Sequence, residues 1–119
     1  MGSRVEGEDL DGRFAAEHDE LRAQWDAIFA ETDRLKVRID AIQSELRRLE
    51  GEIMSSTFIA NPSNATLEEA RTVNRKKNRI LILANEMNDL NEKRRTKSLE
   101  LSRIHNMIEQ LIELRQAAL

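Results

Sequence analysis

The fold of this chain is decided by residues 58–66, which read FIANPSNAT. Pro62 cannot continue a helix and disfavours helix at Asn61, while the asparagines and serine beside it favour a turn. The residues that follow, TLEE, form a capping box with Thr66 as N-cap and Glu69 as the third residue of a new helix. We therefore expect one helix to end before this stretch and a second helix to begin directly after it.

Before the turn, twelve positions follow one another at gaps of four and three residues in a single phase, and ten of them are apolar. They are Phe14, His18, Leu21, Trp25, Ile28, Thr32, Leu35, Ile39, Ile42, Leu46, Leu49 and Ile53. The same spacing runs after the turn through Val73, Lys76, Ile80, Leu83, Met87, Leu90, Arg94, Lys97, Leu101, Ile104, Ile108, Leu111, Arg115 and Ala118. This spacing is typical of the seam of a coiled coil. The sequence predicts an all-α fold, a long antiparallel coiled-coil helical hairpin.

The chain of 119 residues has room for one domain. Residues 1–12 are glycine-rich and acidic, which predicts a flexible leader. Residues 13–119 are expected to form a single helical-hairpin domain. The expected elements are a first helix over about 13–57, a loop over about 58–65 and a second helix over about 66–117.

Folding the chain at Ser63 brings together residues whose numbers add up to about 126. Thr32, a polar position in the first seam, then lies level with Arg94 and Lys97, the polar positions in the second seam. We expect a polar layer here, in which the two basic side chains reach toward carboxylates such as that of Glu31. Such layers fix the register of paired helices at some cost in stability. The same register places Phe14 opposite Ile112.

Near both ends of the chain the apolar stripe is wider than a two-helix seam needs, which indicates contact with more than one helix. We expect a partner or dimer interface at this open end of the hairpin, where two hairpins would join into a four-helix bundle. A homodimer is the first expectation, and a helix of an unidentified protein partner in the same groove is the alternative. The predicted interface comprises Phe14, Leu21, Trp25, Ile28, Phe29, Leu101, Ile104, Met107, Ile108, Leu111 and Ile112.

Two other places carry apolar residues beyond the seam. Leu81 and Ile82 point away from it, either as ordinary surface residues or as a partner-facing patch. Phe58 and Ile59 flank the turn, where they either fold over the end of the seam or form an exposed hydrophobic tip. Folding over the seam is the expected arrangement for the second pair.

The sequence carries no catalytic signature. It lacks cysteine, a phosphate-binding glycine loop and a nucleophile elbow, so we expect no enzyme activity and no cofactor. His18 and His105 lie near carboxylates at the same end of the hairpin and are expected to be ordinary interface histidines rather than metal ligands. No apolar run approaches the ~18 residues of a membrane span, so no membrane partner is expected. A soluble, cytoplasmic protein is expected.

Five basic residues gather at the loop end of the second helix: Arg71, Arg75, Lys76, Lys77 and Arg79. They could contact the phosphates of a nucleic acid. Glutamates of the facing helix lie at the same level, and no aromatic side chain stands among the five to stack on bases. The net charge of −3 is also unlike that of a typical nucleic-acid binder. Pairing within the hairpin is the expected role of these residues.

These features predict a non-enzymatic coiled-coil interaction protein, such as an adaptor, scaffold, stalk or inhibitor. It would act by helix–helix binding to itself or to a protein partner. The alternative is a nucleic-acid-binding oligomer that uses the basic face of the second helix, such as a phage packaging or partition factor.

Overall fold

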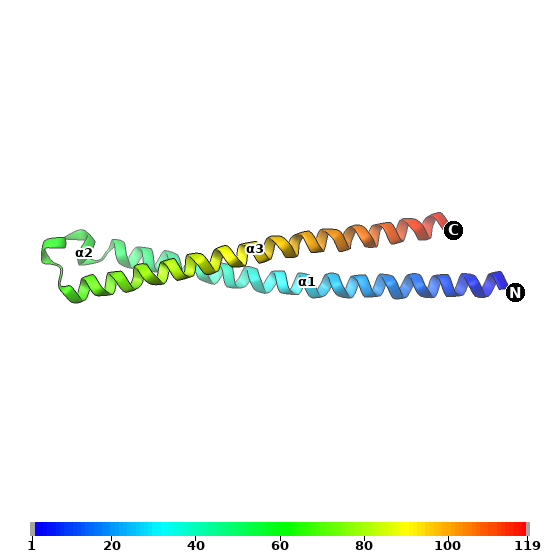
Figure 1. Ribbon diagram of the computed structural model, residues 1–119, viewed down its shortest axis with the longest axis horizontal. Helices are drawn as coiled ribbons and strands as arrows, with labels where there is room; N and C mark the ends of the chain where they lie inside the picture. Colours follow the sequence, from blue (N-terminus) through cyan, green and yellow to red (C-terminus); the bar gives the residue numbers. More distant parts are fainter. Residues whose placement is uncertain (1, 119) are drawn as a thin grey trace. The chain divides into compact units, whose positions relative to one another are not determined.

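The computed structural model describes the backbone of residues 2–118 and the side chains of residues 11–118. The elements, in chain order, are α1 (Gly2–Met54), α2 (Thr57–Ala60), a 3-10 turn η1 (Pro62–Asn64) and α3 (Leu67–Ala118). The two long helices α1 and α3 pack against each other as a hairpin joined through α2 and η1 (Figure 1). The predicted all-α hairpin fold is confirmed.

The helix boundaries differ from the predicted ones by small amounts at three of four ends. α1 ends at Met54 instead of about 57, and α3 runs over Leu67–Ala118 instead of about 66–117. α1 begins at Gly2, ahead of the predicted start near residue 13. The leader predicted for residues 1–12 lies largely outside the residues whose side chains are described, and its flexibility stays a prediction.

The connection between the long helices is more regular than the predicted loop. The backbone N–H of Asn61 donates to the carbonyl oxygen of Thr57 at 2.8 Å and closes α2. Pro62 then occupies the first position of η1, where its missing N–H costs no hydrogen bond. Thr66 caps α3 as predicted, because its hydroxyl oxygen accepts the backbone N–H of Glu69 at 3.1 Å.

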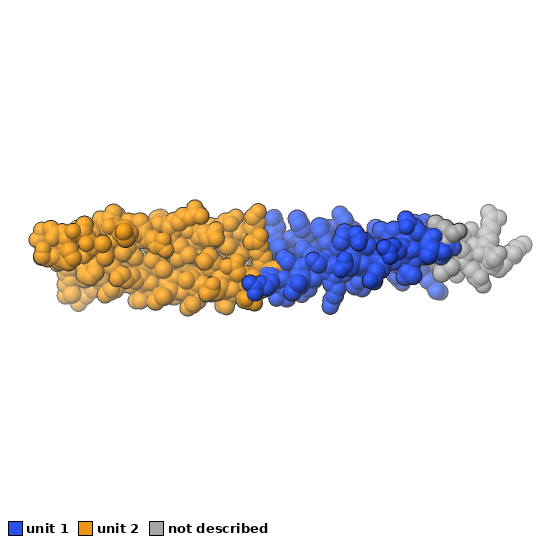
Figure 2. Space-filling view, turned by 90° about the horizontal axis from the view of Figure 1, so that it is seen from above, with its two compact units in different colours: residues 1–33, 95–119 blue, residues 34–94 orange. Residues whose placement is uncertain are grey.

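The chain divides into two compact units, and both long helices contribute to each of them (Figure 2). Unit 1 consists of residues 1–33 and 95–119, and unit 2 of residues 34–94. Unit 1 therefore contains both chain ends, and unit 2 contains the turn. The two units differ in how well their apolar side chains are covered.

Unit 2 holds most of the buried core. Ile42 and Leu83 are fully buried, and Leu49 packs with them in one cluster. Six of the seven buried apolar side chains among the described residues belong to this unit: Ile39, Ile42, Leu49, Ile53, Val73 and Leu83. All six are predicted seam positions, so the seam prediction is confirmed where the helices pack most tightly.

Ion pairs between α1 and α3 confirm the predicted register. They include Arg38–Glu86 at 2.9 Å, Glu45–Arg79 at 3.3 Å, Glu52–Lys76 at 3.2 Å, Glu31–Lys97 at 3.0 Å and Asp11–Arg115 at 3.7 Å. The two residue numbers of each pair add up to between 124 and 128, around the predicted value of about 126. Each pair lies inside a single unit.

The predicted polar layer forms only in part. Lys97 reaches Glu31 as expected, and Glu100 also lies 3.6 Å from its ammonium group. Thr32 does not take part, because its hydroxyl donates to the backbone carbonyl of Ile28 one turn earlier at 3.0 Å. Arg94 is exposed rather than turned into the seam, since a long charged side chain can keep its head in water.

Candidate protein-interaction surface

The predicted interface residues all belong to unit 1, where they are covered far less than the core of unit 2. Of these described residues only Ile104 is buried, with 4% of its surface exposed. Phe29 and Met107 are 51% and 45% exposed. The remaining eight lie half-buried between the two helices: Phe14, Leu21, Trp25, Ile28, Leu101, Ile108, Leu111 and Ile112. α1 and α3 thus share these residues without enclosing them, and we call this set the open-end surface.

Three side chains of α1 form a stack on the open-end surface. The rings of Trp25 and Phe29 lie 5.1 Å apart with an angle of 10° between their planes. The guanidinium of Arg22 lies 5.1 Å from the centre of the Trp25 ring. Positions three and four apart on a helix are neighbours, so the stack is fixed within α1 itself. It presents a large, rigid apolar area of the kind that anchors protein interfaces.

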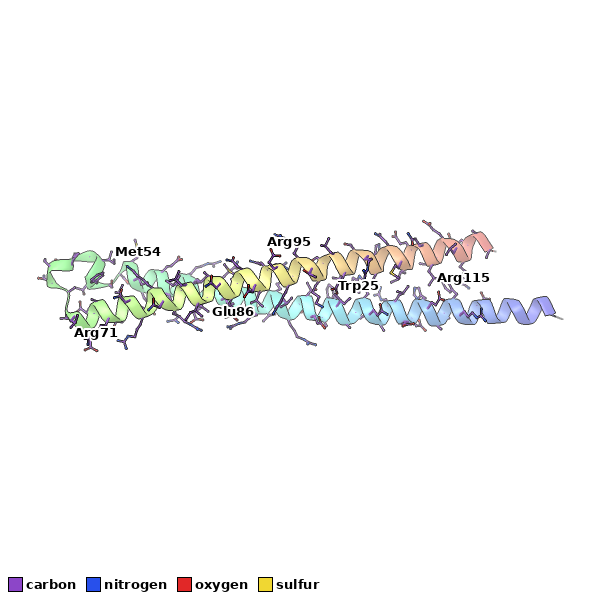
Figure 3. All side chains as sticks on the ribbon, viewed as in Figure 1. Trp25, Met54, Arg71, Glu86, Arg95 and Arg115 are labelled. Atoms are coloured by element: carbon purple, nitrogen blue, oxygen red, sulfur yellow. The ribbon has the colours of Figure 1, made fainter. Side chains whose placement is uncertain are left out.

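A second cluster forms around Phe14 and includes Arg115 of α3, which is labelled in Figure 3. The guanidinium of Arg115 lies 4.5 Å from the centre of the Phe14 ring, and it also contacts the carboxylate of Asp11. One helical turn further along α1, the His18 ring stacks on the Phe14 ring, with 5.9 Å between their centres. Arg115 therefore links α3 to α1 here, which explains how a predicted seam position can hold a charged residue.

The other apolar patches separate into covered and uncovered residues. Phe58 is half-buried, as expected for a side chain that folds back near the turn, whereas Ile59 is exposed. Leu81 and Ile82 are 64% and 58% exposed on α3. Four further apolar residues are exposed although no periodic pattern in the sequence distinguishes them: Val37, Met54, Leu67 and Leu99.

The five basic residues at the start of α3 differ in whether they contact α1. Lys76 and Arg79 pair with Glu52 and Glu45 of α1, as the sequence analysis expected. Arg71, Arg75 and Lys77 are exposed, and Arg71 projects outward from the start of α3 (Figure 3). Arg71 and Arg75 line a shallow depression of about 410 Å³ together with Glu68, Asn74 and Asn78.

Hydrogen bonds between the helices shift the pKa of four charged groups, Arg38, Glu52, Glu86 and Lys97. The guanidinium of Arg38 donates two hydrogen bonds to Glu86, which holds the pKa of that carboxyl below its usual range and raises the pKa of Arg38. The ammonium of Lys76 lowers the pKa of Glu52 in the same way. A hydrogen bond to Glu31 raises the pKa of Lys97.

Neither histidine has the surroundings of a metal ligand. His105 lies 3.0 Å from Glu109 on α3, and His18 lies 3.8 Å from Asp19 on α1. Within the described part of the chain, no group of three or more histidine, aspartate or glutamate side chains is arranged to hold a metal ion. Among the same residues, no helix is long and apolar enough to cross a membrane.

Comparison with known proteins returned no match, whether to family models, to curated proteins or to solved structures.

Proposed function

We propose that this protein is a non-enzymatic helix–helix interaction protein that binds through the open-end surface of unit 1. The observation that carries the proposal is the contrast in burial between the units. Ile42 and Leu83 are fully buried in unit 2. Of the predicted interface residues in unit 1, only Ile104 is buried, the other seam residues are half-buried, and Phe29 and Met107 beside them are about half exposed. A seam that two helices leave uncovered is completed by a further helix.

The favoured occupant is the open-end surface of a second copy, which gives a homodimer. A two-fold pairing would cover the same residues on both chains at once and bury the aromatic stack of Trp25 and Phe29. Charge supports this pairing. Within unit 1, α1 carries mainly carboxylates, among them Glu17, Glu20 and Asp26, whereas α3 carries a small excess of basic side chains. Contact between α1 of one copy and α3 of the other therefore joins opposite charges.

The oligomeric state tests this proposal. Light scattering at about 50 µM should give a dimer for the natural sequence and a monomer for the double variant Phe29→Ser, Met107→Ser. Neither Phe29 nor Met107 occupies the seam, so the double variant should keep the helical circular dichroism of the natural sequence. Val37→Ser with Leu99→Ser is the matched control, since these residues are exposed apolar side chains outside the surface and should leave the dimer intact.

A monomer at that concentration would assign the open-end surface to a helix of another protein. Capture from the native host with the natural sequence, the double variant and the control as baits then decides the matter. A partner retained by the control and lost with the double variant supports the proposal. Equal capture by all three baits, together with equal mass in solution, would contradict it.

The alternative function is nucleic-acid binding through α3, and the depression beside Arg71 and Arg75 is the observation that supports it. Because Lys76 and Arg79 already pair with glutamates of α1, few cations remain for phosphate contacts. Binding of a labelled DNA fragment at low salt, lost in Arg71→Glu with Arg75→Glu, would favour this alternative. If the natural sequence does not bind the DNA fragment at low salt, nucleic-acid binding through α3 is excluded.

A further inference from the structure

The outward face of α3 carries a second stripe with the spacing of a coiled-coil seam. Asn74, Asn78, Leu81, Asn85 and Asn88 follow one another at gaps of four, three, four and three residues. Such gaps place side chains in one line along a helix. All five are exposed, whereas the seam residues of the same helix face α1. This stripe is not needed to hold the hairpin together.

The composition of the stripe is unusual for a solvent-facing helix. Charged residues make up 34% of the chain, yet the stripe contains none over its whole length. Asparagine is a weaker helix former than lysine, glutamate or arginine. Four asparagines in line therefore give α3 no local advantage. Leu81 and its neighbour Ile82 add two largely exposed aliphatic side chains at the middle. Contact with another surface accounts for such a stripe better than solvation does.

The stripe is symmetric about Leu81. Asn74 lies seven residues before it and Asn88 seven residues after it, and Asn78 and Asn85 lie three before and four after. A two-fold axis at this point would therefore place asparagine opposite asparagine and leucine opposite leucine. Interfaces between identical surfaces have this property, because every contact occurs twice.

The charges beside the stripe are arranged about a centre one residue further along α3, at Ile82. Arg75 lies seven residues before Ile82 and Asp89 seven residues after it. Arg71 and Glu92 extend the stripe at its two ends with opposite charges. In an antiparallel pairing each arginine of one copy would meet an acidic residue of the other. The depression lined by Arg71 and Arg75 would then receive carboxylates of the second copy.

We propose that this face of α3, from Arg71 to Glu92, binds the same face of a second copy in antiparallel orientation about a two-fold axis at Leu81. Asparagine amides both donate and accept, so facing asparagines satisfy each other. Asparagines in a helical seam also fix the register of the pair and lower its stability. With one aliphatic centre and polar flanks, the contact belongs to the weak class, with a dissociation constant on the order of micromolar or higher.

This surface is distinct from the open-end surface, because the stripe lies in unit 2 and the open-end surface in unit 1. The proposal therefore does not rest on the proposed function. It also fixes which residues meet, so disulfide trapping can test it directly. The natural sequence has no cysteine, and each introduced thiol is the only one in its chain.

The first experiment compares Leu81→Cys with Val37→Cys under mild oxidation. Both positions are 64% exposed, so solvent access is matched. Both are made in a chain that also carries Phe29→Ser and Met107→Ser, which removes dimers formed through the open-end surface. We expect covalent dimers to form at least about tenfold faster for Leu81→Cys, because the two-fold axis brings its thiols together. Equal rates would overturn the proposal.

The second experiment tests the register. Asn78→Cys alone should trap dimers slowly, since its two copies would lie about six residues out of register, or about 9 Å apart along the helix. An equimolar mixture of Asn78→Cys and Asn85→Cys chains should form mixed dimers rapidly. Rapid trapping by Asn78→Cys alone, with no gain in the mixture, would overturn the antiparallel arrangement.

The third experiment reverses charges beside the axis in the Leu81→Cys chain. Arg75→Asp and Asp89→Arg should each slow trapping several-fold, because like charges then face each other, and the double variant should restore it. If the double variant instead slows disulfide trapping by the combined effect of the two single substitutions, the pairing of Arg75 with Asp89 is contradicted. If Arg75→Asp instead abolishes DNA binding and leaves trapping unchanged, the face serves nucleic acid and the proposed dimer contact is wrong.

Discussion

At the scale of single residues, the hairpin is held in register by charged pairs at its surface. Arg38 and Glu86 make the best-defined contact, with two hydrogen bonds at 2.9 and 3.1 Å between guanidinium and carboxylate. Exposed pairs of this kind contribute little to stability because water screens them. Their value lies in specificity, because a shifted register would place different charges opposite one another.

The pair between Arg38 and Glu86 predicts a pH dependence. The folded state lowers the pKa of Glu86, so the contribution of this carboxylate to stability is fully present above its ordinary pKa of 4.5 and is lost as the pH falls through the lowered value. The melting temperature of the natural sequence should exceed that of Glu86→Gln at pH 7. Thermal melts followed by circular dichroism should show this difference shrinking toward zero at strongly acidic pH.

Glu50→Gln is the control for the loss of a charge alone, since Glu50 is an exposed carboxylate of the same unit. The difference in melting temperature between Glu50→Gln and the natural sequence should change less between pH 7 and strongly acidic pH. A Glu86→Gln difference that persists unchanged in strong acid would contradict the role assigned to the ion pair.

A second prediction at this scale concerns the core. Ile42 is fully buried, so Ile42→Ala should lower the free energy of unfolding by about 2–4 kcal/mol. Ile28→Ala removes the same atoms from a half-buried position in unit 1 and should cost about half as much or less. Urea titrations of both variants, made in the Phe29→Ser, Met107→Ser chain to exclude dimers, measure the difference. Equal losses would show that unit 1 encloses its seam as well as unit 2 does.

At the scale of the helical elements, α1 and α3 owe their length to the scarcity of helix-breaking residues after residue 12. Gly51 is the only glycine in that part of the chain, and it lies inside α1 close to its end. No atom lies within 4 Å of the place where its Cβ would stand. A glycine at position 51 is therefore required neither by close packing nor by an unusual backbone angle.

Gly51→Ala should accordingly stabilise the protein by about 0.5–1 kcal/mol, because alanine loses less backbone entropy in a helix. The measurement is the urea midpoint, with an unchanged slope. Thr66→Ala provides the opposite case at the start of α3, where loss of the cap to Glu69 should cost about 1 kcal/mol. A destabilised Gly51→Ala would mean that the glycine meets a surface absent from the isolated chain.

At the scale of the whole molecule, the two units should differ in local stability. Of the seven buried side chains among residues 11–118, six belong to unit 2 and one, Ile104, belongs to unit 1. Regions with few buried apolar contacts open more readily than the core. The same two helices therefore combine a well-packed part with a part that has apolar surface left to offer.

Hydrogen exchange can measure this difference. In the Phe29→Ser, Met107→Ser chain, backbone amides around Ile42 and Leu83 should exchange more slowly than those around Ile28 and Leu111. In the natural sequence, protection of unit 1 should rise with protein concentration as its surface becomes covered. Equal protection of both units in the variant, at every concentration, would contradict this division.

The sequence by itself determined the helices, the turn and the register. The spacing of apolar residues defines which face of each helix is buried, Pro62 and its neighbours interrupt the helix once, and the length on either side sets which residues meet. The ion pairs confirm that register to within two residues of the predicted sum. Local chemistry and periodicity are sufficient here because a hairpin pairs neighbouring segments in order.

Only the tertiary structure decided how completely the seam is covered and which charges are paired. Periodicity predicts that Trp25 and Ile42 both lie in the seam, yet Trp25 is half-buried and Ile42 is fully buried. Arg79 and Arg75 belong to one basic cluster in the sequence, yet only Arg79 reaches a glutamate of the facing helix. The physical reason is that burial and ion pairing depend on the distance between two helices, whereas a sequence pattern records only the direction in which each side chain leaves its own helix.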